Sequence, residues 1–101
     1  MIKGNDLTQK TILDFLKTHK RQLELEYGLT KIGLFGSYAK NTFDQERDID
    51  IVIEATKHDF FMREDLKEYL EDVFDTRVDI GYIGTIRQFY RQKIDKDILY
   101  V

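Results

Sequence analysis

The chain has 101 residues, of which 16 are Lys or Arg and 19 are Asp or Glu, so its formal net charge is −3 at pH 7. With 42% hydrophobic residues and no proline, it is expected to form a single domain over residues 1–101. The mild acidity argues against direct nucleic-acid binding, which needs a clustered excess of Lys and Arg. The absence of cysteine excludes disulfides and zinc-thiolate centres. A metal site would therefore be built mostly from carboxylates, which favour a hard ion such as magnesium.

The sequence contains no membrane or export signal that we can identify. No apolar run approaches the roughly 18 residues of a membrane-spanning helix. Residues 1–10 lack the hydrophobic core of a signal peptide. We therefore expect a cytoplasmic protein without a membrane partner.

The first element is predicted to be one long helix. Asp6 and Gln9 are spaced as in a capping box, and apolar residues then recur at helical spacing as far as Gly28, a typical helix stop. A short apolar run over residues 31–35 predicts a buried strand that ends in a tight turn at Gly36-Ser37. Ser37 is expected to cap a short helix over residues 38–41.

The segment 48–54 is the most informative part of the chain. Carboxylate and β-branched side chains alternate strictly in its first residues, which predicts a strand. The period of two directs Asp48 and Asp50 to one face and Ile49, Ile51 and Ile53 to the core.

Four further segments follow. Helical spacing predicts a helix over residues 61–74, and residues 77–83 form a predicted strand that contains Asp79 between Val78 and Ile80. Thr85 and Gln88 are spaced as a capping box for a helix that extends to about residue 93. Residues 98–101 could be a last strand or a packed tail. This order predicts an α/β (α+β) fold, a small mixed sheet with helices packed mainly on one face.

Three aspartates carry the functional prediction. Asp48, Asp50 and Asp79 would converge from neighbouring strands, and carboxylates that close repel one another unless a cation lies among them. Magnesium fits, because two such ions can orient a nucleoside triphosphate and activate a hydroxyl. At Gly36 and Ser37, a close backbone approach and exposed N–H groups could hold phosphate oxygens.

Each feature also has a simpler interpretation. The alternating aspartates are typical of a solvated strand face, and Gly36-Ser37 is typical of an ordinary capped turn. Their combination with Asp79 favours a metal and nucleotide site. The two histidines have no second ligand at a suitable spacing, and we expect structural roles for them. Basic residues near the carboxyl end are typical of a solvated helix face, with a triphosphate or partner contact as the alternative: Arg87, Arg91, Lys93 and Lys96.

The spacing of these motifs resembles the polymerase-beta-like nucleotidyltransferase superfamily. The matching segments are the Gly-Ser turn at residues 36–40, the Asp-x-Asp strand at 48–53 and the third aspartate within 78–80. The small size is similar to the minimal nucleotidyltransferase (MNT) proteins, which are encoded beside HEPN-domain partners. The resemblance covers residues 30–101.

The resemblance implies an antitoxin that transfers AMP from ATP to a tyrosine hydroxyl of its HEPN ribonuclease toxin. It implies that Asp48 and Asp50 bind two magnesium ions and that Asp79, the third metal-site carboxylate, helps to activate the hydroxyl. Gly36 and Ser37 match the turn that grips phosphate.

The chain departs from the family pattern at three positions. Lys40 stands where arginine is more common, which keeps the charge but loses the bidentate fork. Asn41 replaces a frequent glycine, and asparagine tolerates the left-handed backbone that such a turn needs. Arg47 replaces a small serine, and it could contact a phosphate or pair with Asp48.

Two other functions remain open from the sequence. A non-catalytic binding module could neutralise the HEPN partner by occlusion, with the aspartates as relics. A transferase for a small molecule such as an aminoglycoside would use the same site, but it needs extra helices for the acceptor pocket, for which this chain has no length.

Overall fold

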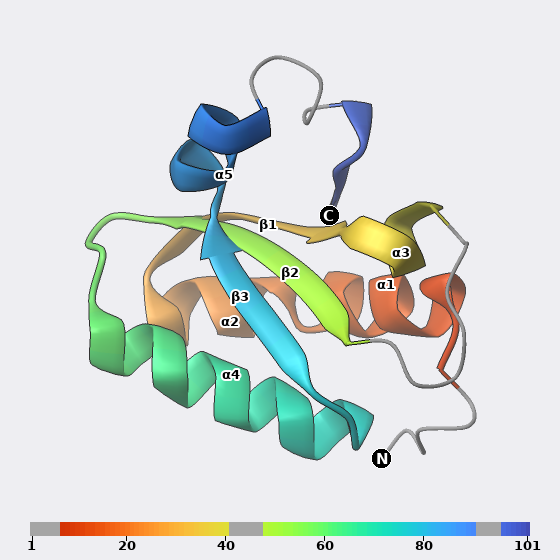
Figure 1. Cartoon of the computed structure of the whole chain (residues 1–101). Helices are drawn as coiled ribbons and strands as arrows, with labels where there is room; N and C mark the ends of the chain where they lie inside the picture. The colour runs from red at the N-terminus through yellow and green to blue at the C-terminus, as the bar shows by residue number, and fades with distance from the viewer. Residues whose placement is uncertain (1–6, 41–47, 91–95) are drawn as a thin grey trace.

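The structure is a computed structural model that describes residues 7–40, 48–90 and 96–101, with the backbone alone at residues 89 and 90. Helices and strands alternate along it (Figure 1). Their bounds are α1 Gln9–Thr18, α2 Lys20–Tyr27, β1 Leu29–Phe35, α3 Gly36–Lys40, β2 Ile49–Ala55, α4 Phe60–Phe74, β3 Val78–Tyr82, α5 Ile83–Tyr90 and β4 Leu99–Tyr100.

The four strands form one mixed sheet in the order β3-β2-β1-β4. Strand β2 pairs antiparallel with β1 and parallel with β3, while β4 pairs antiparallel with β1. Helices α1, α2 and α4 cover one face of the sheet, and α5 lies on the other (Figure 1). The predicted fold class is therefore confirmed, including the helices packed mainly on one face.

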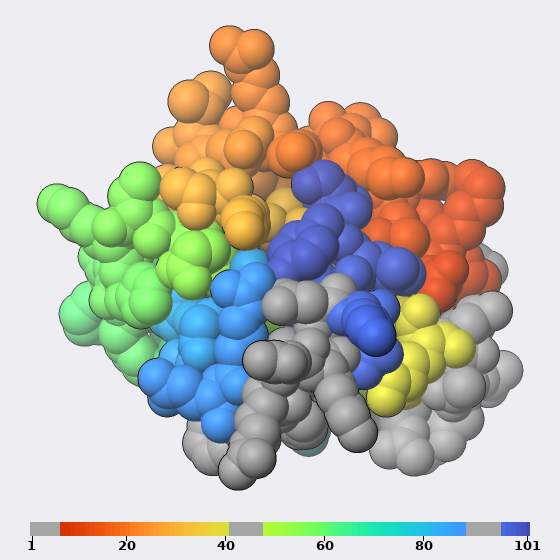
Figure 2. Space-filling view, turned by 90° about the horizontal axis from the view of Figure 1, so that it is seen from above, coloured from red at the N-terminus to blue at the C-terminus, as the bar shows by residue number. Residues whose placement is uncertain are grey.

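The main core lies between the sheet and the three helices that cover it. The predicted inward residues of β2, Ile49, Ile51 and Ile53, are fully buried there with Leu70 and Phe74 of α4. The opposite face, called here the open face, carries a small apolar cluster of Val52, Ile83 and Ile98. Figure 2 views this face and shows α5 and the carboxyl-terminal residues lying across it. The open face is thus only partly covered within the described residues.

The single long helix predicted before Gly28 is wrong, because the helix is interrupted at His19. The backbone there has φ −103° and ψ 9°, which is outside the helical range. The His19 ring stacks on Phe15 with centroids 4.1 Å apart, and its Nδ1 lies 3.0 Å from the Phe15 carbonyl oxygen. The His19 amide donates to the same carbonyl oxygen at 3.0 Å, and α2 starts again at Lys20.

Three predicted helix starts are also wrong. Helix α1 is capped by Thr8 rather than Asp6, which lies outside the described residues. Helix α3 begins at Gly36, so Ser37 lies in its first turn and does not precede it. Helix α5 begins at Ile83 directly after β3, so Thr85 is an internal residue. The predicted strands and the 61–74 helix agree with β1 to β4 and α4 to within two residues at their ends.

We expect Thr8→Ala to lower the free energy of unfolding by about 1 kcal/mol. The Thr8 hydroxyl accepts a hydrogen bond from the Thr11 amide, and the Thr11 hydroxyl accepts one from the Thr8 amide. Loss of this reciprocal cap should lower the Tm by roughly 4–8 °C for a domain of this size. Thermal unfolding followed by circular dichroism measures the change. Thr18→Ala is the matched control, and equal losses in both variants would contradict the capping role.

Candidate active site

Two of the predicted aspartates are brought together by the parallel pairing of β2 and β3. Asp50 is the register partner of Asp79, and side chains in register on neighbouring strands point to the same face. Asp50 is half-buried and Asp79 is exposed. Asp48 directly precedes β2 and is also half-buried. The sheet therefore gathers carboxylates at one end of the open face, as the alternating pattern predicted.

The Asp50 carboxylate packs directly against the backbone of Gly36. Gly36 has φ +73°, a left-handed conformation that other residues adopt only with strain. A Cβ atom added there would overlap Asp50 Oδ2 and lie 3.0 Å from Asp50 Cγ. Glycine is thus required both for the turn from β1 into α3 and for the close approach of the carboxylate.

The environment of Asp50 disfavours its negative charge. Burial raises the pKa of the Asp50 carboxyl above its usual range, and the neighbouring carboxylates of Asp79 and Asp48 raise it further. Repulsion of this kind is relieved when a cation is bound among the carboxylates.

A cavity of about 250 Å³ opens beside the two paired aspartates. Apart from Asp50 and Asp79 its lining is apolar, and it comes from β1, β2, β3 and α5. At Gly81 in the lining, an added Cβ would lie 2.8 Å from Ile86 Cδ1, so this glycine allows α5 to pack closely on β3. The remaining lining residues are Phe35, Ile51, Val52 and Ile80.

The predicted phosphate-binding residues lie on or after α3. Ser37 is half-buried in the first turn of that helix, and Lys40 is exposed at its last position. Arg47 lies outside the described residues. The short α3 is held from a distance by Gln9, whose Nε2 donates to the carbonyl oxygens of Tyr38 at 3.2 Å and Ala39 at 2.8 Å. No sequence pattern signals this contact, since the spacing of Gln9 from Asp6 indicates a capping box instead.

The described histidines lie apart from the aspartates. His58 Nε2 is 2.7 Å from Glu54 Oε1, and its ring stacks on Tyr82 with centroids 3.8 Å apart. His19 contacts Phe15 on α1, as described above. These contacts agree with the structural roles expected for both residues.

The donor chemistry of the aspartate cluster fits a hard divalent cation, which prefers carboxylate oxygens. Within residues 7–40, 48–90 and 96–101, no three acidic, histidine or cysteine side chains are already gathered as a metal site. The fit therefore rests on the donor type, on the register of Asp50 with Asp79 and on the unfavourable charge of Asp50.

In the same ranges, no helix is long and apolar enough to cross a membrane.

The family described as nucleotidyltransferase domain matches residues 16–100, and the chain belongs to that family. The family resemblance drawn from the motifs is thereby confirmed.

Two curated relatives align over nearly the whole chain. A candidate protein adenylyltransferase of Methanocaldococcus jannaschii is 36% identical over 96 residues, covering 93% of this chain and 98% of the relative. The protein adenylyltransferase MntA of Thermococcus cleftensis is 28% identical over 96 residues, covering 94% of this chain and 97% of the relative. The chain is therefore similar in length as well as in sequence to protein adenylyltransferases.

Solved structures have the same fold. A candidate minimal nucleotidyltransferase has a TM-score of 0.76 at 19% identity, covering 92% of this chain and 95% of that one. A toxin-antitoxin structure with AMP-PNP has a TM-score of 0.66 at 25% identity, covering 93% of this chain and 72% of that one. A Shewanella oneidensis MNT antitoxin in complex with a tri-AMPylated HEPN toxin matches at 23% identity with a TM-score of 0.60, covering 86% of this chain and 69% of that one.

Proposed function

We propose that this chain is a single-domain, cytoplasmic antitoxin that transfers AMP from ATP to a tyrosine hydroxyl of a partner HEPN toxin. Membership of the nucleotidyltransferase family and the similarity to protein adenylyltransferases support the reaction class. The observation that carries the proposal is the register of Asp50 with Asp79 beside the Gly36 turn.

The proposed roles follow from the positions of the side chains. Magnesium would be held where β2 and β3 begin, by Asp48, Asp50 and Asp79. The backbone at Gly36 and the hydroxyl of Ser37 would contact the triphosphate. Lys40 lies at the end of the same short helix and would add a positive charge, as would Arg47.

In the proposed reaction the tyrosine oxygen forms a bond to the α-phosphorus of ATP. The bond from that phosphorus to the oxygen bridging toward the β-phosphate breaks, and pyrophosphate leaves with the electron pair. Asp79, the exposed carboxylate of the pair, would accept the hydroxyl proton. Bound magnesium would supply positive charge for the triphosphate and for the attacking oxygen, with two ions proposed.

A protein acceptor is supported by the similarity to protein adenylyltransferases over nearly the whole chain. The acceptor hydroxyl would then come from a partner molecule. The toxin-antitoxin structure with AMP-PNP, at 25% identity, supports a toxin as that molecule.

The test is the intact mass of the HEPN protein encoded beside this chain, measured after incubation with this chain, ATP and magnesium. We expect a gain of whole AMP units, with the acceptor located by fragmentation at a tyrosine. The double variant Asp48→Asn, Asp50→Asn should give no gain.

Absence of a mass gain, together with a stable and inactive toxin complex, would reject AMP transfer. The same complex formed equally well by the double variant would instead support neutralisation by occlusion.

A further inference from the structure

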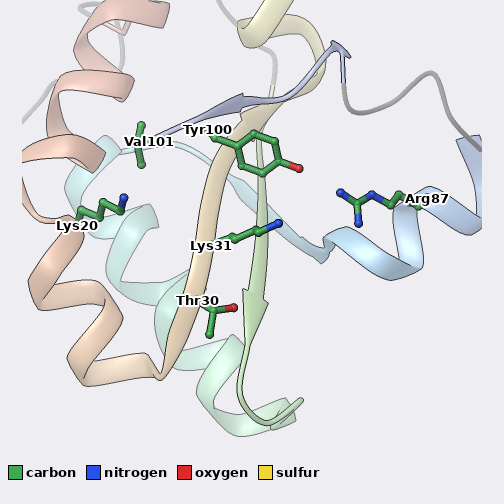
Figure 3. Close-up of a pocket in the computed structure, with 6 residues that line it drawn as sticks. All are labelled: Lys20, Thr30, Lys31, Arg87, Tyr100 and Val101. Atoms are coloured by element: carbon green, nitrogen blue, oxygen red, sulfur yellow. The ribbon is translucent and has the colours of Figure 1, made fainter.

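A second cavity, of about 400 Å³, lies at the other end of β1 (Figure 3). Lys31 lines it, whereas Phe35 lines the cavity beside the aspartates. Residues 31, 33 and 35 alternate with inward-facing ones, so Lys31 and Phe35 point to the open face. They are four residues apart along the strand, or about 13 Å. The second cavity is lined by Lys20, Thr30, Lys31, Arg87, Tyr100 and Val101.

The small apolar cluster separates the two cavities. Gly33 lies between Lys31 and Phe35 on β1, and Ile98 of the cluster packs on it. A Cβ atom added at Gly33 would lie 2.7 Å from Ile98 Cγ2. The apolar contact between Val52, Ile83 and Ile98 thus closes the open face between the aspartates and the second cavity.

The second cavity gathers positive charge in a chain with a net charge of −3. Lys20, Lys31 and Arg87 come from α2, β1 and α5. Neither lysine pairs with a carboxylate within the described part of the chain. In Figure 3, Lys31 and Tyr100 extend toward Arg87, while Lys20 lies at the far side. Cationic side chains around a cavity favour an anionic ligand.

The ring of Tyr100 in the lining favours an anion that also carries a flat group. Tyr100 is 40% exposed, and Lys31 Nζ lies 5.9 Å from the centroid of its ring. An exposed ring beside a cation offers a stacking surface for a flat group next to a phosphate. The volume lies in the usual range of small-molecule sites, about 300–1,000 Å³.

We propose that this cavity binds a nucleoside phosphate at a site separate from the aspartates. The phosphates contact Lys31 and Arg87, and the base stacks on Tyr100. The proposal does not depend on AMP transfer, since it concerns binding alone.

The test is a titration of the isotope-labelled full chain with ADP, followed by amide NMR in the presence of EDTA. We expect saturable shifts at Thr30, Lys31 and Tyr100. Lys31→Gln and Arg87→Gln should each weaken ADP binding by about tenfold or more, since each removes a charge-assisted contact. Lys67→Gln on α4, which packs on the other face of the sheet, is the matched control and should leave the affinity unchanged.

A second ligand tests the role of the ring. Pyrophosphate has phosphates without a base, so it should bind more weakly than ADP, and Tyr100→Leu should remove the difference. Equal affinity of the two ligands for the unaltered chain would overturn the nucleoside part of the proposal. Shifts confined to Ser37, Asp50 and Asp79 would overturn the separate site. Displacement of ADP by a glutamate-rich peptide at lower concentration would assign the cavity to a protein segment instead.

Discussion

Asp50→Asn is expected to abolish AMP transfer and, in the absence of metal, to make the protein more stable. The transfer rate should fall on the order of 10³-fold or more, because a metal ligand is lost from a charge-stabilising site. Stability should rise because Asp50 is held beside Asp79 and Asp48 in a partly buried position that raises its pKa. Asparagine has nearly the same shape and no charge to be repelled.

The pH dependence of this gain has a defined sign. The pKa of Asp50 in the folded protein lies above its ordinary value of 3.8. Ionisation therefore lowers the free energy of unfolding as the pH rises above that value, and the loss is complete above the raised pKa. In EDTA, the Tm of Asp50→Asn should exceed that of the unaltered chain at pH 7, and the two should converge toward pH 3.

Magnesium should reverse the order of stability. A ligand that binds only the folded chain raises its Tm, so magnesium should stabilise the unaltered chain and have little effect on Asp50→Asn. Asp72→Asn on α4 is the matched control and should behave like the unaltered chain in both assays. Full transfer by Asp50→Asn, or a Tm below that of the unaltered chain in EDTA, would contradict the assigned site.

Gly36→Ala is expected to have the second large effect. The left-handed backbone should cost about 1–2 kcal/mol of stability with alanine. The added methyl group would also displace the Asp50 carboxylate, and a displacement of about 1 Å at a reacting centre can cost 10²-fold in rate. AMP transfer and thermal unfolding measured on the same preparation give both quantities.

A double-mutant cycle separates the backbone strain from the clash. In an Asp50→Ala background the carboxylate is absent. The stability cost of Gly36→Ala should then be only the part that comes from backbone strain. Gly84→Ala is the matched control, since its nearest neighbour lies 3.9 Å away at Glu54 Oε2. An equal cost in both backgrounds would mean that the methyl group does not touch Asp50.

Much of the site could be predicted because strand geometry is periodic. A period of two determines that Asp50 faces away from Ile49 and Ile51, whatever packs on the strand. The order of the elements also limits the topology, since a helix such as α4 usually connects two neighbouring parallel strands. These two rules place Asp50 and Asp79 on one face of neighbouring strands, and the structure shows that they are also in register.

The helix boundaries were less predictable because they depend on single side-chain contacts. The break at His19 leaves the apolar spacing of Leu16 and Leu23 intact, so the periodicity continues through it. The cap at Thr8 uses threonine at both positions, where the expected partner is a glutamate or glutamine. The second cavity could not be predicted, since its lining comes from segments far apart in the sequence, and Tyr100 joins it only through the pairing of β4 with β1.

The two hydrogen bonds from Gln9 have a consequence for any shortened form of the protein. A helix of five residues has too few internal bonds to be stable alone, so α3 depends on Gln9 at its carbonyl end. The region shared with the nucleotidyltransferase family begins at residue 16 and does not include Gln9. Trimming the chain to that shared region would preserve Asp48, Asp50 and Asp79 and yet release the turn against which Asp50 is positioned.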